Sequence, residues 1–359
     1  MTKSELLRRK AQLEKDIAKF SNMQLAKKVQ LNSAYGALGN QWFRFYDIRQ
    51  ALAITKSGQL SIKWIEARIN EYLNKLLETD KVDYVLASDT DSLYIVLDKL
   101  IEKFKPKNPI DFLDQVAQQK IEPFIDNAYL QLADLMNAYD QKMYMKREAI
   151  ADIGIWTAKK RYMLNVYDNE GVRYDEPKLK MMGIEAIKSS TPQACRDAMK
   201  KCFKLIMSGE QEVVQKYIAD FKTEFFSLSF EDVAFPRGVS ELNKYDSGER
   251  EQLELVKGTP IHVRGALVYN HLIRKHKLEK KYQTVKDGEK IKFCYMKEPN
   301  SMKQNVLSIL NVLPTEFGVE KYIDYETQFN KSFSEPLQLI LEKIGWSVEK
   351  RATLEDFFS

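Results

Sequence analysis

The run YVLASDTDSLYIVL constrains the fold of this 359-residue chain more than any other stretch. Two apolar segments, 84–87 and 93–97, flank a polar centre, and this pattern predicts two strands joined by a tight turn. Because Asp is depleted in strands and favoured in turns, we expect a β-hairpin with 88–92 at its tip. Asp89 and Asp91 would then lie together at the end of the hairpin.

Two carboxylates at such a tip can converge on one point, and Mg²⁺ is usually held by one or two carboxylates together with water and phosphate oxygens. An Asx turn, in which each Asp accepts a hydrogen bond from a backbone amide, explains the same pattern without metal. The three cysteines, Cys195, Cys202 and Cys294, form no metal-ligand cluster in the sequence and are expected to be reduced thiols. A metal ion is therefore expected on carboxylates.

Composition favours a soluble, intracellular protein of about two domains. Hydrophobic residues make up 44% of the chain, and no apolar run approaches the roughly 18 residues of a membrane span. The N-terminal residues lack the apolar core of a secretion signal. The net charge of +5 does not by itself indicate a nucleic-acid partner, but 274–292 holds eight basic and three acidic residues. This basic segment can follow a phosphate backbone or form a solvated loop.

Long helices are predicted on both sides of the hairpin. Apolar residues recur at helical spacing in 3–20, and a second helix is expected at 21–35, with Gly36 ending it. A longer helix is expected at 49–77, where an apolar stripe indicates a core-facing side, and a further helical stretch at 108–142.

The second predicted helix has a candidate ligand-binding face. Lys28, Asn32 and Tyr35 are spaced at i, i+4 and i+7, which places a cation, an amide and a phenol on one side of a helix. Such a face can bind a phosphate and the nucleotide attached to it. An exposed Lys beside a capped helix end explains the same spacing.

The stretch MYMKREAIADIGIWTAKKRYMLNVYDNEGVRY is predicted to form β-structure. Within it, Lys159, Lys160 and Arg161 precede Tyr162 on an otherwise apolar strand. Alternate residues of a strand face opposite ways, so Lys159 with Arg161, or Lys160 with Tyr162, can share a face and hold successive phosphates. An exposed edge strand protected by Lys against aggregation is the competing explanation.

A mainly helical second domain is expected beyond a boundary near 183–190. The helix that follows has Pro192 in its first turn and Gly209 after its last. Further on, His262 and Arg264 lie beside Gly265, where a backbone could approach a ligand closely. His262 is also explained as a histidine of the core.

The last residues, RATLEDFFS, place three apolar side chains on one face of a single helical turn. They are Leu354, Phe357 and Phe358. This pattern is typical of a peptide that docks into a partner's groove. A tail folded back on its own body fits the same pattern.

Together these motifs resemble family B DNA polymerases. The runs KVQLNSAYGALGN, SDTDSLY, KKRY, MGIEAIKSSTP and IHVRG stand in the order and approximate spacing of that family, and the likeness is to its T-even-type bacteriophage members. The resemblance implies an α+β fold, in which a palm with an antiparallel β-sheet and helices joins part of the helical fingers and a mainly helical thumb. The implied limits are 1–40 for the fingers helices, 41–185 for the palm, 186–345 for the thumb and 346–359 for a clamp-binding tail.

The resemblance also implies roles for the nucleotide-binding residues. Lys28 is similar to the fingers residue that contacts the triphosphate of the incoming dNTP. Asn32, Tyr35 and Gly36 would border the nascent base pair.

In the palm, Asp91 resembles the invariant carboxylate that binds both catalytic Mg²⁺ ions. Asp89 would be a less direct catalytic neighbour, and Glu148 a secondary acid near the metals. Two Mg²⁺ ions would activate the primer 3′-hydroxyl and stabilise the leaving pyrophosphate.

The DNA contacts implied by the resemblance come from three places. One is the KKRY run, in which Lys159, Lys160, Arg161 and Tyr162 would grip the primer terminus, with Lys160 nearest the bases. His262 and Arg264 would belong to the hold of the thumb on the duplex, and Leu354, Phe357 and Phe358 would bind a sliding clamp.

Some parts of the family pattern have no counterpart in this sequence. They are the DxxSLYPS-type palm motif with the other metal-binding Asp, the exonuclease motifs and a second fingers helix. Because the chain opens with Met1 and ends in a clamp-type tail, although Arg351 stands where many such peptides have Gln, we interpret it as the C-terminal subunit of a split polymerase. Its expected partners are primer–template DNA, dNTPs, an N-terminal polymerase polypeptide and the clamp, with no membrane, in the cytoplasm of an infected bacterial host. The alternative is a noncatalytic DNA- and clamp-binding remnant.

Overall fold

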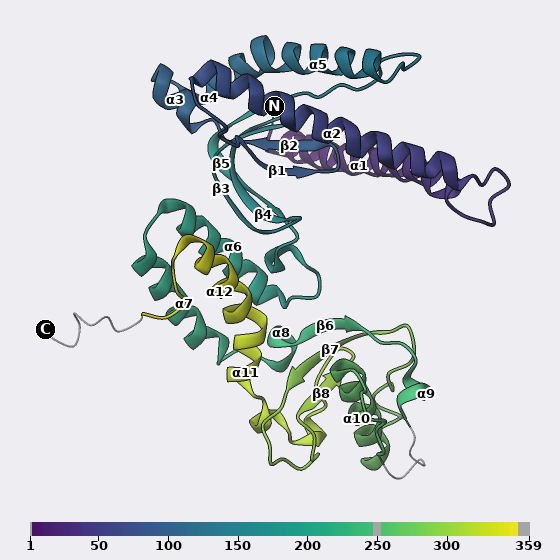
Figure 1. Ribbon diagram of the computed structural model, residues 1–359. Helices are drawn as coiled ribbons and strands as arrows, with labels where there is room; N and C mark the ends of the chain where they lie inside the picture. Colours follow the sequence, from purple (N-terminus) through teal and green to yellow (C-terminus); the bar gives the residue numbers. More distant parts are fainter. Residues whose placement is uncertain (1, 247–252, 351–359) are drawn as a thin grey trace, which may run out of the picture. The chain divides into compact units, whose positions relative to one another are not determined.

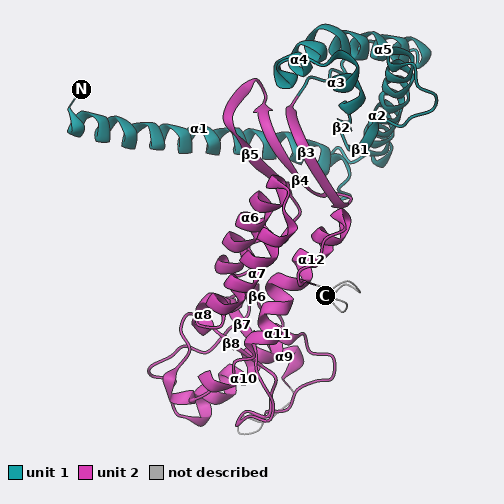
Figure 2. Ribbon diagram, turned by 90° about the vertical axis from the view of Figure 1, so that its left-hand side faces the viewer, with its two compact units in different colours: residues 1–147 teal, residues 148–359 magenta. Residues whose placement is uncertain are grey.

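The computed structural model describes residues 2–246 and 253–350 (Figure 1). The chain forms two compact units, residues 1–147 and 148–359, which Figure 2 shows in different colours. The predicted clamp-binding residues Leu354, Phe357 and Phe358 lie outside the described residues. The described part contains no helix with the length and apolar character needed to cross a membrane.

The first unit is built from helices and one β-hairpin. Its elements are α1 (Lys3–Leu38), α2 (Ile48–Leu77), β1 (Val85–Asp89), β2 (Ser92–Ile95), α3 (Asp98–Phe104), α4 (Pro109–Val116) and α5 (Glu122–Leu135). A π-helical turn at 117–121 joins α4 to α5. The helical prediction for 108–142 is therefore confirmed up to Leu135 and wrong beyond it.

Helix α1 differs from the prediction of two helices that meet at Ser21. It is one helix of 36 residues, which begins at a capping box formed by Thr2 and Glu5. No Gly or Pro interrupts the sequence near Ser21, so nothing in the backbone forces a break there. The helix also passes Gly36 and ends at Leu38, because one glycine costs a helix only about 1 kcal/mol.

The core of the first unit lies between α2 and α5. The predicted apolar stripe of α2 is confirmed at Ile65, Ile69 and Leu73, which are buried, and wrong at Ile54, which is exposed. They belong to one hydrophobic cluster with Ile125 and Tyr129 of α5. In contrast, α1 has no buried residue.

The second unit combines two three-stranded antiparallel sheets with helices. The strands are β3 (Ala149–Ala158), β4 (Arg161–Asn169), β5 (Val172–Met182), β6 (Phe235–Gly238), β7 (Lys290–Tyr295) and β8 (Val306–Ile309). The helices are α6 (Gln193–Ser208), α7 (Gln211–Phe225), α8 (Phe230–Val233), α9 (Leu242–Tyr245), α10 (Ile261–Lys275), α11 (Tyr325–Phe329) and α12 (Glu335–Leu341). The described strands pair antiparallel, so the α+β fold class is confirmed.

The sheet β6–β7–β8 was not predicted, because the sequence beyond residue 190 indicated helices and loops. Two of its strands have only four residues, which is too short for a clear alternation of apolar and polar side chains. The first sheet and α6 share one core, in which Met163 and Ile184 pack with Cys195 and Phe203. The division between the compact units falls at 147/148, inside the expected palm, and the limits of the polymerase subdomains stay a prediction.

Candidate functional site

The DTDS hairpin is confirmed as β1 and β2 of the first unit. Asp89 is the last residue of β1 and pairs with Ser92 of β2, so Thr90 and Asp91 form a two-residue turn. The backbone N–H of Asp91 donates a hydrogen bond to the Asp89 carbonyl oxygen at 2.6 Å. Both acidic residues therefore lie at the tip of one hairpin.

The turn holds Thr90 in the left-handed region, with a φ of 58°. This conformation is a strained one for a β-branched residue, and such strain clusters at functional sites. The Thr90 hydroxyl donates to the Asp89 carboxylate at 3.1 Å, while the exposed Asp91 carboxylate accepts no hydrogen bond from residues 2–246 or 253–350. An Asx turn therefore does not explain Asp91.

Asp89 and Asp91 suit one side of a magnesium site. Within the described residues, no group of three or more His, Cys, Asp or Glu side chains could hold a metal ion. Mg²⁺ does not need a complete protein cage, since it commonly keeps water and phosphate ligands beside one or two carboxylates. These two side chains can thus contribute to a site that substrate phosphates and further ligands complete.

The predicted face of α1 is present and open. Lys28, Asn32, Tyr35 and Gly36 are all exposed, with Tyr35 at 43% of its full accessibility. A Cβ atom added at Gly36 would meet no atom within 4 Å, so this glycine leaves free space on the helix surface. The face can accept a planar or phosphorylated ligand alongside the helix.

The KKRY run lies at a hairpin turn of the second unit, which corrects its expected place on a strand. Lys159 and Lys160 form the turn between β3 and β4, and Arg161 and Tyr162 begin β4. Lys160 has a φ of 61°. Because β4 is the middle strand of its sheet, the explanation by an exposed edge strand is wrong. The two lysines lie instead in the exposed turn between these strands.

Three internal contacts hold this turn. The Arg161 guanidinium donates to both carboxylate oxygens of Glu185, at 2.9 and 2.7 Å. A Cβ atom at Gly183 would lie 2.2 Å from the Lys160 carbonyl oxygen, so a glycine is required beside the turn. The Tyr162 ring is buried and stacks on Trp156 with centroids 5.7 Å apart. Sequence reasoning missed Gly183 and Glu185, although the run MGIEAIKSSTP was among its motifs.

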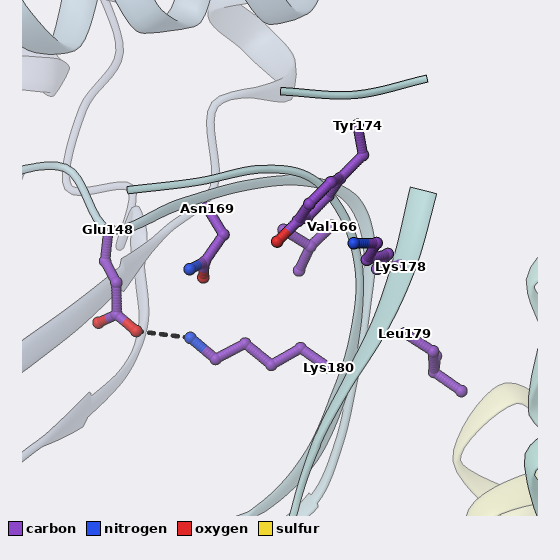
Figure 3. Close-up of a pocket in the computed structure, with 7 residues that line it drawn as sticks. All are labelled: Glu148, Val166, Asn169, Tyr174, Lys178, Leu179 and Lys180. Atoms are coloured by element: carbon purple, nitrogen blue, oxygen red, sulfur yellow. Dashed lines mark hydrogen bonds and ion pairs between the residues drawn. The ribbon is translucent and has the colours of Figure 1, made fainter. Parts of the chain in front are cut away.

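Glu148 directly precedes β3, and its side chain faces Lys180 of β5. Its carboxylate and the Lys180 ammonium lie 2.5 Å apart, drawn as a dashed line in Figure 3. The pair borders a hollow of about 400 Å³. The other residues that line the hollow are Val166, Asn169, Tyr174, Lys178 and Leu179. The carboxylate of Glu148 is thus paired with a lysine of β5.

His262, Arg264 and Gly265 lie on the first turns of α10. Burial, and then the positive charge of Arg237, lower the pKa of His262. Arg264 donates to the Asn305 side-chain oxygen at 2.6 Å.

Gly265 does approach another backbone closely, but that backbone is β8 rather than a ligand. A Cβ atom there would lie 2.4 Å from the Ser308 hydroxyl oxygen and 2.9 Å from the Ser308 nitrogen. The expectation of a ligand beside Gly265 is therefore replaced by close helix–sheet packing.

The basic segment 274–292 is partly neutralised by Glu316. Lys281 lies 2.5 Å from the Glu316 carboxylate, and the Tyr282 hydroxyl donates to it at 3.0 Å. The hydrogen bond from Lys281 lowers the pKa of Glu316 to about 2. The segment is not one solvated loop, because it includes the start of β7 at Lys290.

Comparison with known proteins identifies the family of this chain. Residues 1–108, which contain the α1 face and the hairpin, match DNA polymerase family B. The chain belongs to DNA polymerase family B and corresponds to a region of the T-even-type members of that family.

Two phage proteins illustrate the relationship. The DNA-directed DNA polymerase of Enterobacteria phage T4 is 38% identical over 353 residues, which cover 93% of this chain and 38% of the phage protein. The DNA-directed DNA polymerase of Escherichia phage RB69 is 38% identical over 355 residues, with the same coverage of both chains. This chain therefore spans well under half the length of either relative.

Proposed function

We propose that this chain supplies the C-terminal catalytic portion of a DNA-directed DNA polymerase that adds dNTPs to a primer 3′-hydroxyl on a template. The observation that carries the proposal is the pair of a half-buried Asp89 and an exposed Asp91 at a hairpin tip, in a chain that is similar along 93% of its length to phage DNA polymerases. Phosphoryl transfer needs positioning and charge stabilisation more than a protein nucleophile. Carboxylates that hold metal ions, together with cations that hold phosphates, meet that need.

The nucleotide side of the site is assigned to α1. Lys28 would pair with the triphosphate, and Asn32, Tyr35 and Gly36 would border the new base pair. Support comes from their exposure on one face of one helix. Asp91, with help from Asp89, would hold two Mg²⁺ ions, which supply Lewis-acid stabilisation of the phosphate when bound. Glu148 would act near the metals only secondarily, because Lys180 engages its carboxylate.

The DNA side is assigned to the second unit. The lysines of the turn, Lys159 and Lys160, would grip the primer terminus directly, while Arg161 and Tyr162 would hold the turn through Glu185 and Trp156. His262 and Arg264 would contribute to the thumb's hold on the duplex. Ion pairs to phosphate provide most of such binding and make it sensitive to salt.

We further propose that the chain works with a separate N-terminal polymerase polypeptide, which would carry the other catalytic Asp and the exonuclease. Support comes from α1, a 36-residue helix without a buried residue. Leu6, Ile17, Phe20 and Leu31 on it are each more than half exposed. A patch of this kind usually marks an interaction surface. The complex would bind a sliding clamp through Leu354, Phe357 and Phe358 and act in the cytoplasm of an infected bacterial host.

The proposal is tested by co-expressing the chain with an N-terminal polypeptide of a T-even-type polymerase. We expect the two to copurify and to extend a primer in the presence of Mg²⁺, whereas the chain alone should extend it negligibly. Robust synthesis by the purified chain alone would contradict the division of the site. Copurification without synthesis would favour the noncatalytic remnant.

A further inference from the structure

The segment between α2 and β1 is fastened to α2 by side-chain amides. The amide nitrogen of Asn74 donates to the backbone oxygens of Asn70 and Val82, at 2.8 and 2.7 Å. The amide oxygen of Asn74 accepts from the Val82 N–H at 3.0 Å and from the Thr79 hydroxyl at 2.9 Å. These four bonds use both donors and both acceptor sites of the amide, so only a carboxamide side chain can supply all of them.

Asn70, one helical turn earlier, extends the same contact along the chain. Its amide oxygen accepts from the Tyr84 N–H at 2.7 Å, and its amide nitrogen donates to Asp83 at 2.8 Å. The same Asp83 oxygen accepts from the Val85 N–H at 3.0 Å. The two asparagines and Asp83 thus bind the backbone of 82–85 in the way that a neighbouring strand would.

Apart from these bonds, apolar packing on the core of the first unit holds the hairpin. In the described part of the chain, β1 and β2 form a sheet of only two strands, and β2 has four residues. A two-stranded hairpin is marginally stable in water unless it packs against other structure. Tyr84 and Val85 provide that packing at the base, and Leu93 and Ile95 of β2 pack against the same core, while 88–92 at the tip is partly or fully exposed.

We propose that Asn70 and Asn74 are positioning residues for the acidic tip. By fixing 82–85 on α2, they determine where the other end of β1 places Asp89 and Asp91. The metal-binding part of this inference rests on the proposed function, whereas the clamp on the hairpin does not. Hydrogen-bonded supports of metal ligands typically change metal affinity by about 10- to 100-fold when they are removed.

The test uses the full chain and the substitution Asn74→Asp. This change preserves shape but turns a carboxylate oxygen toward the carbonyl oxygens of Asn70 and Val82, where the amide donated. Asn127→Asp is the matched control, because Asn127 is an exposed residue of α5 in the same unit. If Asn74→Asp does not fold, Asn70→Asp serves instead. Adding Asp83→Asn to that variant restores a hydrogen-bond donor between positions 70 and 83, so the double variant should recover the wild-type behaviour.

Two measurements are made on each variant. Hydrogen exchange of 82–95 should become at least about 10-fold faster in Asn74→Asp and remain unchanged in Asn127→Asp. Mn²⁺, followed by water-proton relaxation, serves as a probe of the carboxylate site, and its binding should weaken by about 10-fold or more in Asn74→Asp. Asp91→Asn identifies the Mn²⁺ signal that belongs to the tip.

The outcomes separate the two proposals. Unchanged exchange in 82–95 would overturn the clamp. If hydrogen exchange of 82–95 became faster in Asn74→Asp while Mn²⁺ binding stayed at the wild-type level, the asparagines would support the loop without positioning the carboxylates. If Asp91→Asn itself left Mn²⁺ binding unaltered, the metal site of the proposed function would fail, and the exchange of 82–95 would still decide whether the clamp exists.

Discussion

At the scale of single residues, side chains of the same charge differ in their environment: some lie at the surface, and others pair with a second side chain of the chain. Lys160 and Arg161 are adjacent cations, yet Lys160 lies in an exposed turn while Arg161 is paired with Glu185. In the same way, Asp91 is exposed at its tip whereas Asp168 is buried and paired with Arg173. The type of residue alone does not say which of two charges faces a ligand.

Asp91→Asn should abolish synthesis by the complex of this chain with an N-terminal polypeptide, because an amide cannot supply the anionic oxygen that Mg²⁺ prefers. DNA binding should stay within about twofold of wild type, since repulsion between phosphate and the lost carboxylate is small in water. Primer extension and fluorescence anisotropy measure the two effects. Turnover comparable to wild type would remove Asp91 from the metal site.

Glu185→Gln should destabilise the second unit by about 1–3 kcal/mol, because it leaves the half-buried Arg161 without its anionic partner. The matched control is Asp197→Asn, whose exposed contact with Lys200 at 3.4 Å should change stability by less than about 0.5 kcal/mol. Urea unfolding followed by circular dichroism gives both values. Equal effects of the two substitutions would show that the Glu185 contact is an ordinary surface pair.

At the scale of elements, two glycines in helices have opposite structural meanings. Gly265 of α10 allows the helix to touch β8, whereas Gly58 of α2 has no atom within 4 Å of its Cβ position. Close helix–sheet contact is what places α10, with His262 and Arg264, on the second sheet. The same residue type is thus required in one helix and dispensable in the other.

Gly265→Ala should destabilise the chain by about 1–3 kcal/mol, because the new methyl group overlaps Ser308. Gly58→Ala should instead stabilise it by about 0.5–1 kcal/mol through reduced backbone entropy of the unfolded chain. Thermal unfolding of both variants measures the contrast. Stabilisation by both substitutions would mean that α10 and β8 are not in close contact.

The stability of the second unit should also depend on the protonation of His262. Burial and Arg237 lower its pKa in the folded state, so below about pH 6.5 the unfolded chain binds a proton that the folded chain does not. Stability should therefore fall as the pH is lowered from about 7.5 to 5.5, and His262→Gln should reduce that fall. His276→Gln, at the exposed end of α10, is the control. An unchanged pH dependence in His262→Gln would contradict the assignment.

At the scale of the whole molecule, the surfaces left open indicate what the chain works with. The long α1 offers apolar side chains along its length, and the sequence places three apolar residues near the C-terminal end of the chain. A partner that covers α1 would remove apolar area from water, which is the main driving force of stable association. If α1 binds a partner polypeptide and the tail binds a clamp, as proposed, changes in these two surfaces should affect different properties of the polymerase.

Deleting Phe357 and Phe358 should lower clamp-dependent processive synthesis by the complex at least about 10-fold, because apolar anchors dominate such interfaces. Addition of a single nucleotide without the clamp should be unchanged. Product-length analysis with and without the clamp makes the comparison. An equal loss in both assays would assign the tail a structural role instead.

The sequence alone determined the local features of this protein. They are the DTDS hairpin, the apolar stripe of α2 and the helix face that carries Lys28. Turn preferences, strand alternation and helical periodicity act between residues that are close in the chain, so these features could be predicted. Tertiary structure decided that Arg161 pairs with Glu185, that Gly265 packs on Ser308 and that Asn70 and Asn74 bond to the backbone of 82–84. Each of these contacts depends on where packing and turns bring side chain and backbone together, and no periodic pattern in one sequence records that placement.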